Sequence, residues 1–446
     1  MIEILRQRNF RTLFLAQMVA LVGTGLATVA LALLAYDLAG PNAGAVLGTA
    51  LAIKMTVYIL LSPLAGAFVP LAKRKVVLIT LDIIRACVVL ALPFVTEIWQ
   101  VYVLIALLQS ASAGFTPLFQ SLIPEILTEE RDYTRALSLS RLAYDLENLL
   151  SPAIAAALLT VISFHGLFAG TSVGFALSAL LVSATQFPVS AVIRVVESPY
   201  ARAMRGMRIY LHTPRLRGLL ALNLCAAAGG AMVFVNTVVI VRSALNGGEQ
   251  EVAWALAAFG GGSMLVALLL PKLLDRVPDR RVMLTAALAM VLALAVTTLL
   301  WVMGSDHVGW GTLLPAWAVL GMAYAGLVTP GCRLLRRSAQ TKDLPSLFAA
   351  QFSLSHVCWL LAYPLAGWLG AALGLGAALA ALSALALVGL LAAWRVWPQH
   401  DPAVVPHAHL DLAPYHPHWQ DHASENGTAG HAHDYVIDEL HSRWPG

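Results

Sequence analysis

Long apolar stretches without charge alternate along the chain with short basic connections. Residues 12–36 contain no charged side chain, and the uncharged run 344–394, divided near Gly374, is long enough for two crossings. Because about 20 apolar residues cross a bilayer as a helix, the pattern predicts an all-α membrane protein with twelve transmembrane helices. The other predicted spans are 44–70, 76–96, 98–121, 136–162, 167–193, 218–241, 252–270, 282–305 and 308–332.

Lys and Arg side chains gather in every second connection between these spans. Basic residues in short loops stay in the cytoplasm. With a cytoplasmic N-terminus, most of the 28 Lys and Arg residues fall in cytoplasmic loops, and Arg242 falls in a loop on the other side. The pattern therefore predicts that both termini face the cytoplasm.

The composition excludes an ordinary soluble enzyme. Hydrophobic residues make up 59% of the chain and charged residues only 12%, about half the charged fraction of a typical soluble domain. The sequence lacks the nucleotide-binding motif G-x-x-x-x-G-K-[ST] and the metalloprotease motif H-E-x-x-H, so we expect a non-enzyme, and any transport would run on an ion gradient. The 28 basic residues nearly balance the 24 acidic ones, and nucleic acid is not expected as a partner.

The spans divide into two similar halves. Thr116-Pro117 recurs as Thr329-Pro330 and Ser151-Pro152 as Tyr363-Pro364, at nearly the same offset. Repeated halves that meet at the membrane midplane are typical of secondary transporters. The predicted parts are an N-terminal six-helix bundle, a cytoplasmic linker, a C-terminal six-helix bundle and a tail, at 1–188, 189–216, 217–397 and 398–446.

Two basic loops at corresponding places in the halves carry a recognisable motif. Through these loops, which partly match the motif G-x-x-x-D-R-x-G-R-[RK], the chain resembles the major facilitator superfamily over residues 5–397. In the first half, Pro70 stands at the position of the Asp of this motif. The resemblance implies two six-helix repeats and a loop charge network that helps to lock one conformation. The matching gating-loop residues are Gly66, Arg74, Lys75, Asp275, Arg276, Arg280 and Arg281.

The tail is rich in histidine, acid and proline, a composition that predicts disorder. Residues two apart in an extended chain point the same way, so each H-x-H pair can offer two imidazoles to one ion, and imidazole suits Ni, Co, Zn or Cu better than Mg or Ca. An inert solvated tail is the alternative. The tail resembles those of bacterial nickel-resistance exporters, which favours nickel. The candidate metal ligands are His400, His407, His409, His416, His418, His422, His431, His433 and His441.

Few polar side chains lie at bilayer depth, and each is a functional candidate because burial of such groups in lipid is costly. Asp145 can pair with Arg141 one turn away, and Lys54 can pair with an acid such as Glu147. His356 and Asn223 can instead be packing residues. The candidate substrate or proton path comprises Glu147, His356, Asp145, Asn148, Tyr144, Lys54 and Asn223.

These features predict a secondary-active exporter of a divalent transition metal, nickel or else cobalt, that works by proton antiport and confers metal resistance. The resemblance implies a multi-pass protein of the bacterial inner membrane. No cofactor is expected, because a Ni, Co or Zn ion would be the cargo or would be bound by the tail. Besides the metal ion or small-molecule substrate, the expected partners are protons and the lipid bilayer. The alternatives are an exporter of a drug, siderophore or metal chelate, and a membrane metal sensor.

Overall fold

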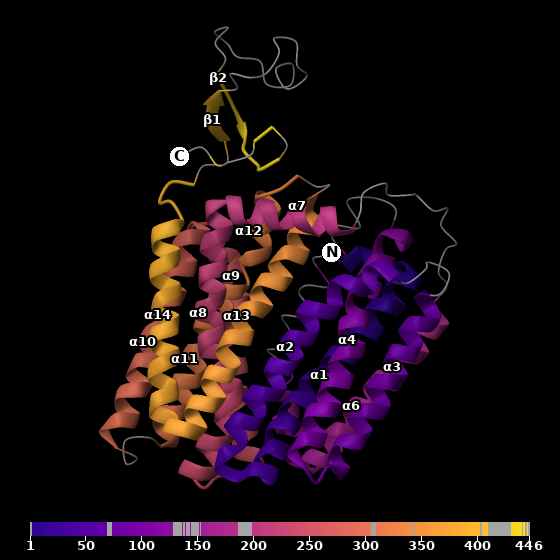
Figure 1. Cartoon of the computed structure of the whole chain (residues 1–446), viewed down its shortest axis with the longest axis vertical. Coiled ribbons are helices and arrows are strands. Elements are labelled where there is room, and N and C mark those ends of the chain that lie inside the picture. The colour runs from indigo at the N-terminus through magenta and orange to yellow at the C-terminus, as the bar shows by residue number, and fades with distance from the viewer. Residues whose placement is uncertain are drawn as a thin grey trace.

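The computed structural model describes most of the chain. Described are residues 2–68, 74–127, 153–185, 199–304, 309–340, 343–401, 404–408 and 430–438, with Ala136, Leu139, Ala143, Ser151, Leu440, His441 and Trp444. Figure 1 shows two bundles of long helices side by side, with both termini at one end of the molecule, here called the terminal end.

The first bundle is built from the N-terminal half. A short 3-10 helix, Ile2–Arg6, precedes the first long helix, and two others, Gly40–Asn42 and Leu92–Phe94, follow α1 and α3. The long helices are α1 (Arg8–Ala39), α2 (Ala43–Phe68), α3 (Arg74–Ala91), α4 (Ile98–Ile126) and α6 (Phe164–Ala184).

The second bundle follows the linker helix α7 (Pro199–His212), which lies within the predicted linker and across the terminal end (Figure 1). A π-helical turn, Ile240–Ala244, extends α8, and the strands β1 (Val404–Ala408) and β2 (Gly430–Asp434) form an antiparallel pair in the tail. Its helices are α8 (Pro214–Val239), α9 (Glu249–Leu274), α10 (Asp279–Met303), α11 (Trp310–Val328), α12 (Gly331–Arg337), α13 (Leu344–Leu373) and α14 (Leu375–Val396).

The predicted membrane spans are confirmed over the described residues. Ten stretches are long and apolar enough to cross a membrane, and the first, Arg8–Leu61, holds both α1 and α2. Large apolar side chains such as Phe94, Leu268 and Val302 lie exposed on these helices, as expected of surfaces that face lipid. Part of the predicted fifth span, 136–162, lies outside the described residues, including residues 144–150. The chain is a multi-pass membrane protein.

The two halves repeat the same packing. In the first half α1 packs on α6 and α2 on α4; in the second, the corresponding pairs are α8 with α14 and α9 with α11. Between the halves, α2 packs along α13. This correspondence agrees with the predicted repeat.

A buried ion pair stabilises the outer side of the first bundle. Asp82 and Arg85, one turn apart on α3, pair with each other, and Asp82 also accepts a hydrogen bond of 2.8 Å from Ser178 on α6. The Arg85 guanidinium lies 4.1 Å and 4.5 Å from the ring centroids of Phe115 and Phe175. Because every contact stays within the first half, we interpret this pair as structural.

Candidate transport pathway

Polar contacts join the halves at the end of the bundle opposite the chain termini, here called the distal end. The Tyr36 hydroxyl lies 2.9 Å from the Ser243 hydroxyl, and a guanidinium nitrogen of Arg242 lies 3.9 Å from the Asp37 carboxylate. The ribbons of the two bundles converge toward this end and diverge toward the terminal end (Figure 1). The boundary between the halves is therefore closed at its distal end.

Glycines bring α2 and α13 into close contact just inside this closure. A Cβ atom added to Gly48 would lie 2.7 Å from the carbonyl oxygen of Tyr363, and one added to Gly44 would lie 2.8 Å from Oδ1 of Asn236 on α8. Gly367 faces the backbone of Gly44 in the same way. Only hydrogen fits between these backbones, so the glycines permit the close approach. We call Gly44, Gly48 and Gly367 the glycine seam.

The predicted His356 lies at the next contact toward the terminal end. Its imidazole stacks on the Tyr58 ring of α2 with a centroid distance of 5.4 Å and an interplanar angle of 17°. Its Nδ1 lies 2.6 Å from the Phe352 carbonyl oxygen, and the Phe352 ring lies 4.0 Å from the imidazole. A titratable ring on one half thus touches a ring on the other half.

Aromatic rings continue along the same face of α13. Spacings of three and four residues place one side of this helix in a row of rings: Phe352, His356, Trp359 and Tyr363. Trp359 also completes a circuit with Phe234 of α8, Phe259 of α9 and Tyr324 of α11, with neighbouring centroids 5.5–6.3 Å apart. Phe234 and Trp359 are only half-buried. Sequence reasoning missed this cluster, although the spacing on α13 was a usable signal.

Two more predicted residues lie on helices of this boundary. Lys54 is half-buried on α2, one turn from Tyr58, so the two side chains leave the same side of the helix. Asn223 is buried on α8, and its side-chain nitrogen has no hydrogen-bond partner among the described residues. A buried donor without a partner is unfavourable, so an acceptor that reached this nitrogen would be stabilised there.

The gating-loop residues of the first half flank α3. Gly66 lies near the end of α2, and Arg74 begins α3. Lys75 donates from Nζ to the carbonyl oxygen of Thr185, at the end of α6, at 2.9 Å. This bond ties the start of α3 to the end of α6 within the first half.

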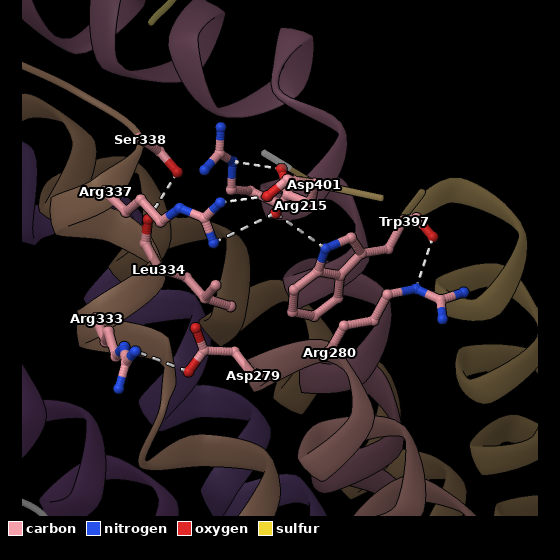
Figure 2. Close-up of polar contacts among 9 residues, drawn as sticks. All are labelled: Arg215, Asp279, Arg280, Arg333, Leu334, Arg337, Ser338, Trp397 and Asp401. Atoms are coloured by element: carbon pink, nitrogen blue, oxygen red, sulfur yellow. Dashed lines mark hydrogen bonds and ion pairs between the residues drawn. The ribbon is translucent and has the colours of Figure 1, made fainter. Parts of the chain in front are cut away.

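The gating-loop residues of the second half lie between α9 and α10, for Asp275 and Arg276, or in the first turn of α10, for Arg280 and Arg281. Asp275, Arg276 and Arg281 are exposed, and Asp275 has no ion pair among the described residues. Arg280 donates from Nε to the carbonyl oxygen of Trp397 at 2.9 Å (Figure 2). The loop is thereby fixed to the end of α14.

The ion pair at this loop uses a different acid. Asp279 begins α10 and lies 3.5 Å from Nε of Arg333 on α12 (Figure 2). Sequence reasoning missed both residues. Their signal was the position of Asp279 in the first turn of a helix, where a negative charge interacts favourably with the helix dipole.

Comparison with known proteins identifies the family. The model of the Major Facilitator Superfamily matches residues 13–238 and again 219–426, so both halves are covered. The chain belongs to the major facilitator superfamily. As a member of this superfamily it is a membrane transporter, and the predicted fold class is confirmed.

Relatives of this superfamily member include efflux proteins. An uncharacterized transporter of the same superfamily from Bacillus subtilis, YfiS, is 24% identical over 400 residues, which cover 86% of this chain and 92% of the relative. Macrolide efflux protein A of Streptococcus pyogenes is 24% identical over 374 residues, with 80% and 87% covered. Both likenesses extend over most of each chain.

Solved structures support the superfamily fold. A D-xylose-proton symporter matches with a TM-score of 0.64 and 15% identity, covering 87% of this chain and 98% of the symporter. A bacterial homologue of the lysosomal transporter Spinster, in an inward-facing and unoccupied conformation, matches with a TM-score of 0.64 and 14% identity, covering 87% and 96%. At these identities the likeness shows the fold alone.

The tail of this superfamily member is partly packed on the bundle. Asp401 forms ion pairs with Arg215 on α8 and Arg337 on α12, and it accepts a hydrogen bond from the Trp397 indole (Figure 2). His441 is buried, and its Nδ1 lies 2.8 Å from Oδ1 of Asp438. The described tail therefore includes docked segments, which the composition alone did not indicate.

The candidate metal ligands are only partly described. His400 is exposed, and the strand register places His407 opposite His431 and His433 opposite Val405. Within the described part of the chain, no group of three or more His, Cys, Asp or Glu side chains is arranged to hold a metal ion. His409, His416, His418 and His422 lie outside the described residues.

The remaining path residues also lie outside the described residues. These are Tyr144, Asp145, Glu147 and Asn148, all within the predicted fifth span. Their roles stay predictions.

Proposed function

We propose that this transporter exports a divalent transition metal, nickel first and cobalt next, from the cytoplasm in exchange for protons. The observation that carries the proposal is the register of the tail strands, which sets His407 directly opposite His431. Opposite positions of an antiparallel pair share one face of the sheet. One histidine from each of two H-x-H pairs that lie far apart in the sequence is thus set opposite the other, and imidazole favours Ni, Co, Zn and Cu over Mg and Ca.

The placement of the tail supports the direction of transport. The described tail segments lie at the terminal end of the second half (Figure 1), and the distribution of basic residues predicts that this end faces the cytoplasm. Export follows if the tail collects ions on the side from which they are removed. The bacterial inner membrane is the proposed location.

The boundary between the halves supports proton coupling. His356 lies on α13 against Tyr58 of α2, and imidazole changes charge near neutral pH. A protonated imidazole cannot coordinate a metal, so uptake of a proton from the distal side would favour release of the ion there. Glu147 is the proposed second cation or proton site. Rocking of the two halves would expose this region alternately to each side.

A second cargo class is favoured by a different observation. The row of rings on α13 and the circuit around Trp359 offer apolar, polarisable surface that suits a bulky organic molecule better than a small ion. Similarity to macrolide efflux proteins points the same way. The second candidate is therefore export of a drug-like organic molecule or a metal chelate.

The deciding experiment measures transport directly. Everted membrane vesicles that contain the protein receive an imposed proton gradient and then nickel, cobalt, zinc, copper or a macrolide. We expect nickel to accumulate inside the vesicles and to dissipate the gradient, and His356→Gln to weaken both effects strongly. Accumulation of the macrolide with no response to any of the four metals would overturn the metal proposal and establish the second candidate.

A further inference from the structure

Two segments of the tail pack on the terminal end of the second half, one before and one after the histidine-rich residues 402–434. The first runs from Trp397 to Asp401, and the second comprises the described residues between Tyr435 and Trp444, namely 435–438, 440, 441 and 444. Trp397, Tyr435 and Ile437 are buried and belong to the main hydrophobic core. We call these two segments the C-terminal latch.

Both segments of the latch meet at one arginine. Arg215, at the start of α8, has a side chain that is only 1% exposed. Its Nε lies 3.5 Å from Oδ1 of Asp401, and its guanidinium carbon lies 4.7 Å from the ring centroid of Trp444. A guanidinium over an indole face is a favourable cation–π contact, more so when water is excluded. One buried cation thus contacts an acid before the histidine-rich residues 402–434 and a ring after them.

The second segment is also stabilised from within. Oδ1 of Asp438 accepts hydrogen bonds from the backbone N–H groups of Leu440 and His441 and lies 2.8 Å from Nδ1 of His441. Burial alone would raise the pKa of Asp438, but these bonds lower its pKa below the usual value. Nε2 of Gln340, beyond α12, donates to the other carboxylate oxygen at 3.4 Å. The Asp438 turn is therefore a formed structure that contacts the bundle.

The latch flanks the strand pair at the end where the chain enters β1 and leaves β2. Strand β1 starts three residues after Asp401, and β2 ends at the residue before Tyr435, with Val404 opposite Asp434. Because the docked latch already holds the start of β1 near the end of β2, pairing of the strands costs less loop-closure entropy. The register that sets His407 opposite His431 therefore depends on the docking of the latch.

We propose that Arg215 is a positioning residue for the tail's metal site: by docking both segments of the latch it holds β1 and β2 in register, and so raises the affinity of the intact tail for nickel. This inference rests on the proposed metal binding by the tail. Coupling between two equilibria is reciprocal, so nickel bound to the strand pair must in turn stabilise the docked latch. Arg215 itself does not contact the ion.

The experiment measures nickel affinity and latch docking on the purified full-length protein in detergent. Arg215→Gln and Trp444→Ala remove the contact from the bundle side and from the tail side, while Arg217→Gln changes an exposed arginine two residues away. Competition with a chromogenic chelator gives the nickel dissociation constant. Protease cleavage of the tail, with and without nickel, reports docking.

We expect Arg215→Gln and Trp444→Ala to weaken nickel binding by about 5- to 150-fold, the usual range of coupling between sites. Arg217→Gln should bind as the wild type does, and Trp444→Phe, which keeps a ring, should restore most of the affinity. Nickel should protect the wild-type tail from cleavage and should protect the two latch variants much less.

The outcomes separate this inference from the proposed function. Wild-type protein that binds no nickel would overturn both. If Arg215→Gln and Trp444→Ala bind nickel as tightly as the wild type and are protected from protease equally well, the latch inference alone is overturned. Because Trp444→Ala leaves every residue of the bundle unchanged, it gives a valid result even if Arg215→Gln fails to fold.

Discussion

The imidazole of His356 and the phenol ring of Tyr58 stack across the boundary between the two halves, with 5.4 Å between their centroids. This contact lies on the terminal side of the glycine seam, where α2 and α13 are held at backbone distance. A charge placed on His356 would therefore act at the contact between halves, and conversely a separation of the halves would change the surroundings of the imidazole. The pair is well placed to link protonation to rocking.

Replacement of His356 should remove the pH dependence of transport. Glutamine keeps a polar side chain but does not titrate, so His356→Gln should lower proton-driven transport by about 5- to 150-fold, in the range typical of coupling between sites. The measurement is initial uptake into everted vesicles between pH 5.5 and 8. Val357→Ala is the matched control, since Val357 is the exposed neighbour on the same helix. An unchanged pH profile in His356→Gln would show that the coupling proton binds elsewhere.

A bulky residue in the glycine seam should keep the distal end from closing. A Cβ at Gly48 would lie 2.7 Å from the Tyr363 carbonyl oxygen, and overpacking of this kind costs about 1–3 kcal/mol. We expect Gly48→Val to shift the population away from the closed distal state and to slow transport by about tenfold or more. Gly261→Val is the control, because nothing lies within 4 Å of a Cβ there.

The readout for the seam is the accessibility of a reporter cysteine. A cysteine substituted for Ser243, which bonds Tyr36 across the distal closure, should react with an external, membrane-impermeant thiol reagent faster in Gly48→Val than in Gly261→Val. Equal rates in the two variants would mean that the seam does not control distal closure.

Much of the fold follows from local sequence patterns. The length and polarity of each apolar stretch predicted the spans, because lipid leaves few other options for a backbone. The repeat of Thr116-Pro117 at Thr329-Pro330 predicted two halves, and the packing of α1 on α6 and α8 on α14 agrees. These features depend on neighbours along the chain.

The contacts of the candidate site could not be predicted in the same way. Tyr58 and His356 belong to different halves, and no local pattern states that their rings meet. The charged contact of the second gating loop uses Asp279 and Arg333, whereas the motif drew attention to Asp275. The latch was overlooked because the tail's average composition is polar, although isolated tryptophans such as Trp444 in such a segment are a sign of docking.

Breaking the ion pair between Asp82 and Arg85 should destabilise the protein without changing its coupling. Removal of one partner of a buried pair costs about 3–5 kcal/mol because the other charge stays buried, and both side chains here are almost fully buried. Arg85→Met should therefore lower the unfolding temperature in detergent, and the double variant Asp82→Leu with Arg85→Met should recover much of it. Any protein that remains folded should transport with the wild-type pH profile. A single variant as stable as the wild type would show that the pair contributes no net stability.

The ring circuit around Trp359 should distinguish the two cargo classes. If an organic molecule is carried, the half-buried indole is a contact for it, and Trp359→Ala should weaken transport of that molecule by about tenfold or more, as for other buried aromatic anchors. If the cargo is a metal ion, the same change should leave the apparent affinity for nickel unchanged, because an indole offers no ligand atom to a divalent cation. Trp254→Ala, at an exposed tryptophan of α9, controls for the loss of an indole. The measurement is the concentration dependence of uptake into vesicles, for nickel and for a macrolide. If the cargo is organic, Trp359→Ala should weaken its uptake and Trp254→Ala should not. If the cargo is a metal ion, neither variant should change the apparent affinity for nickel.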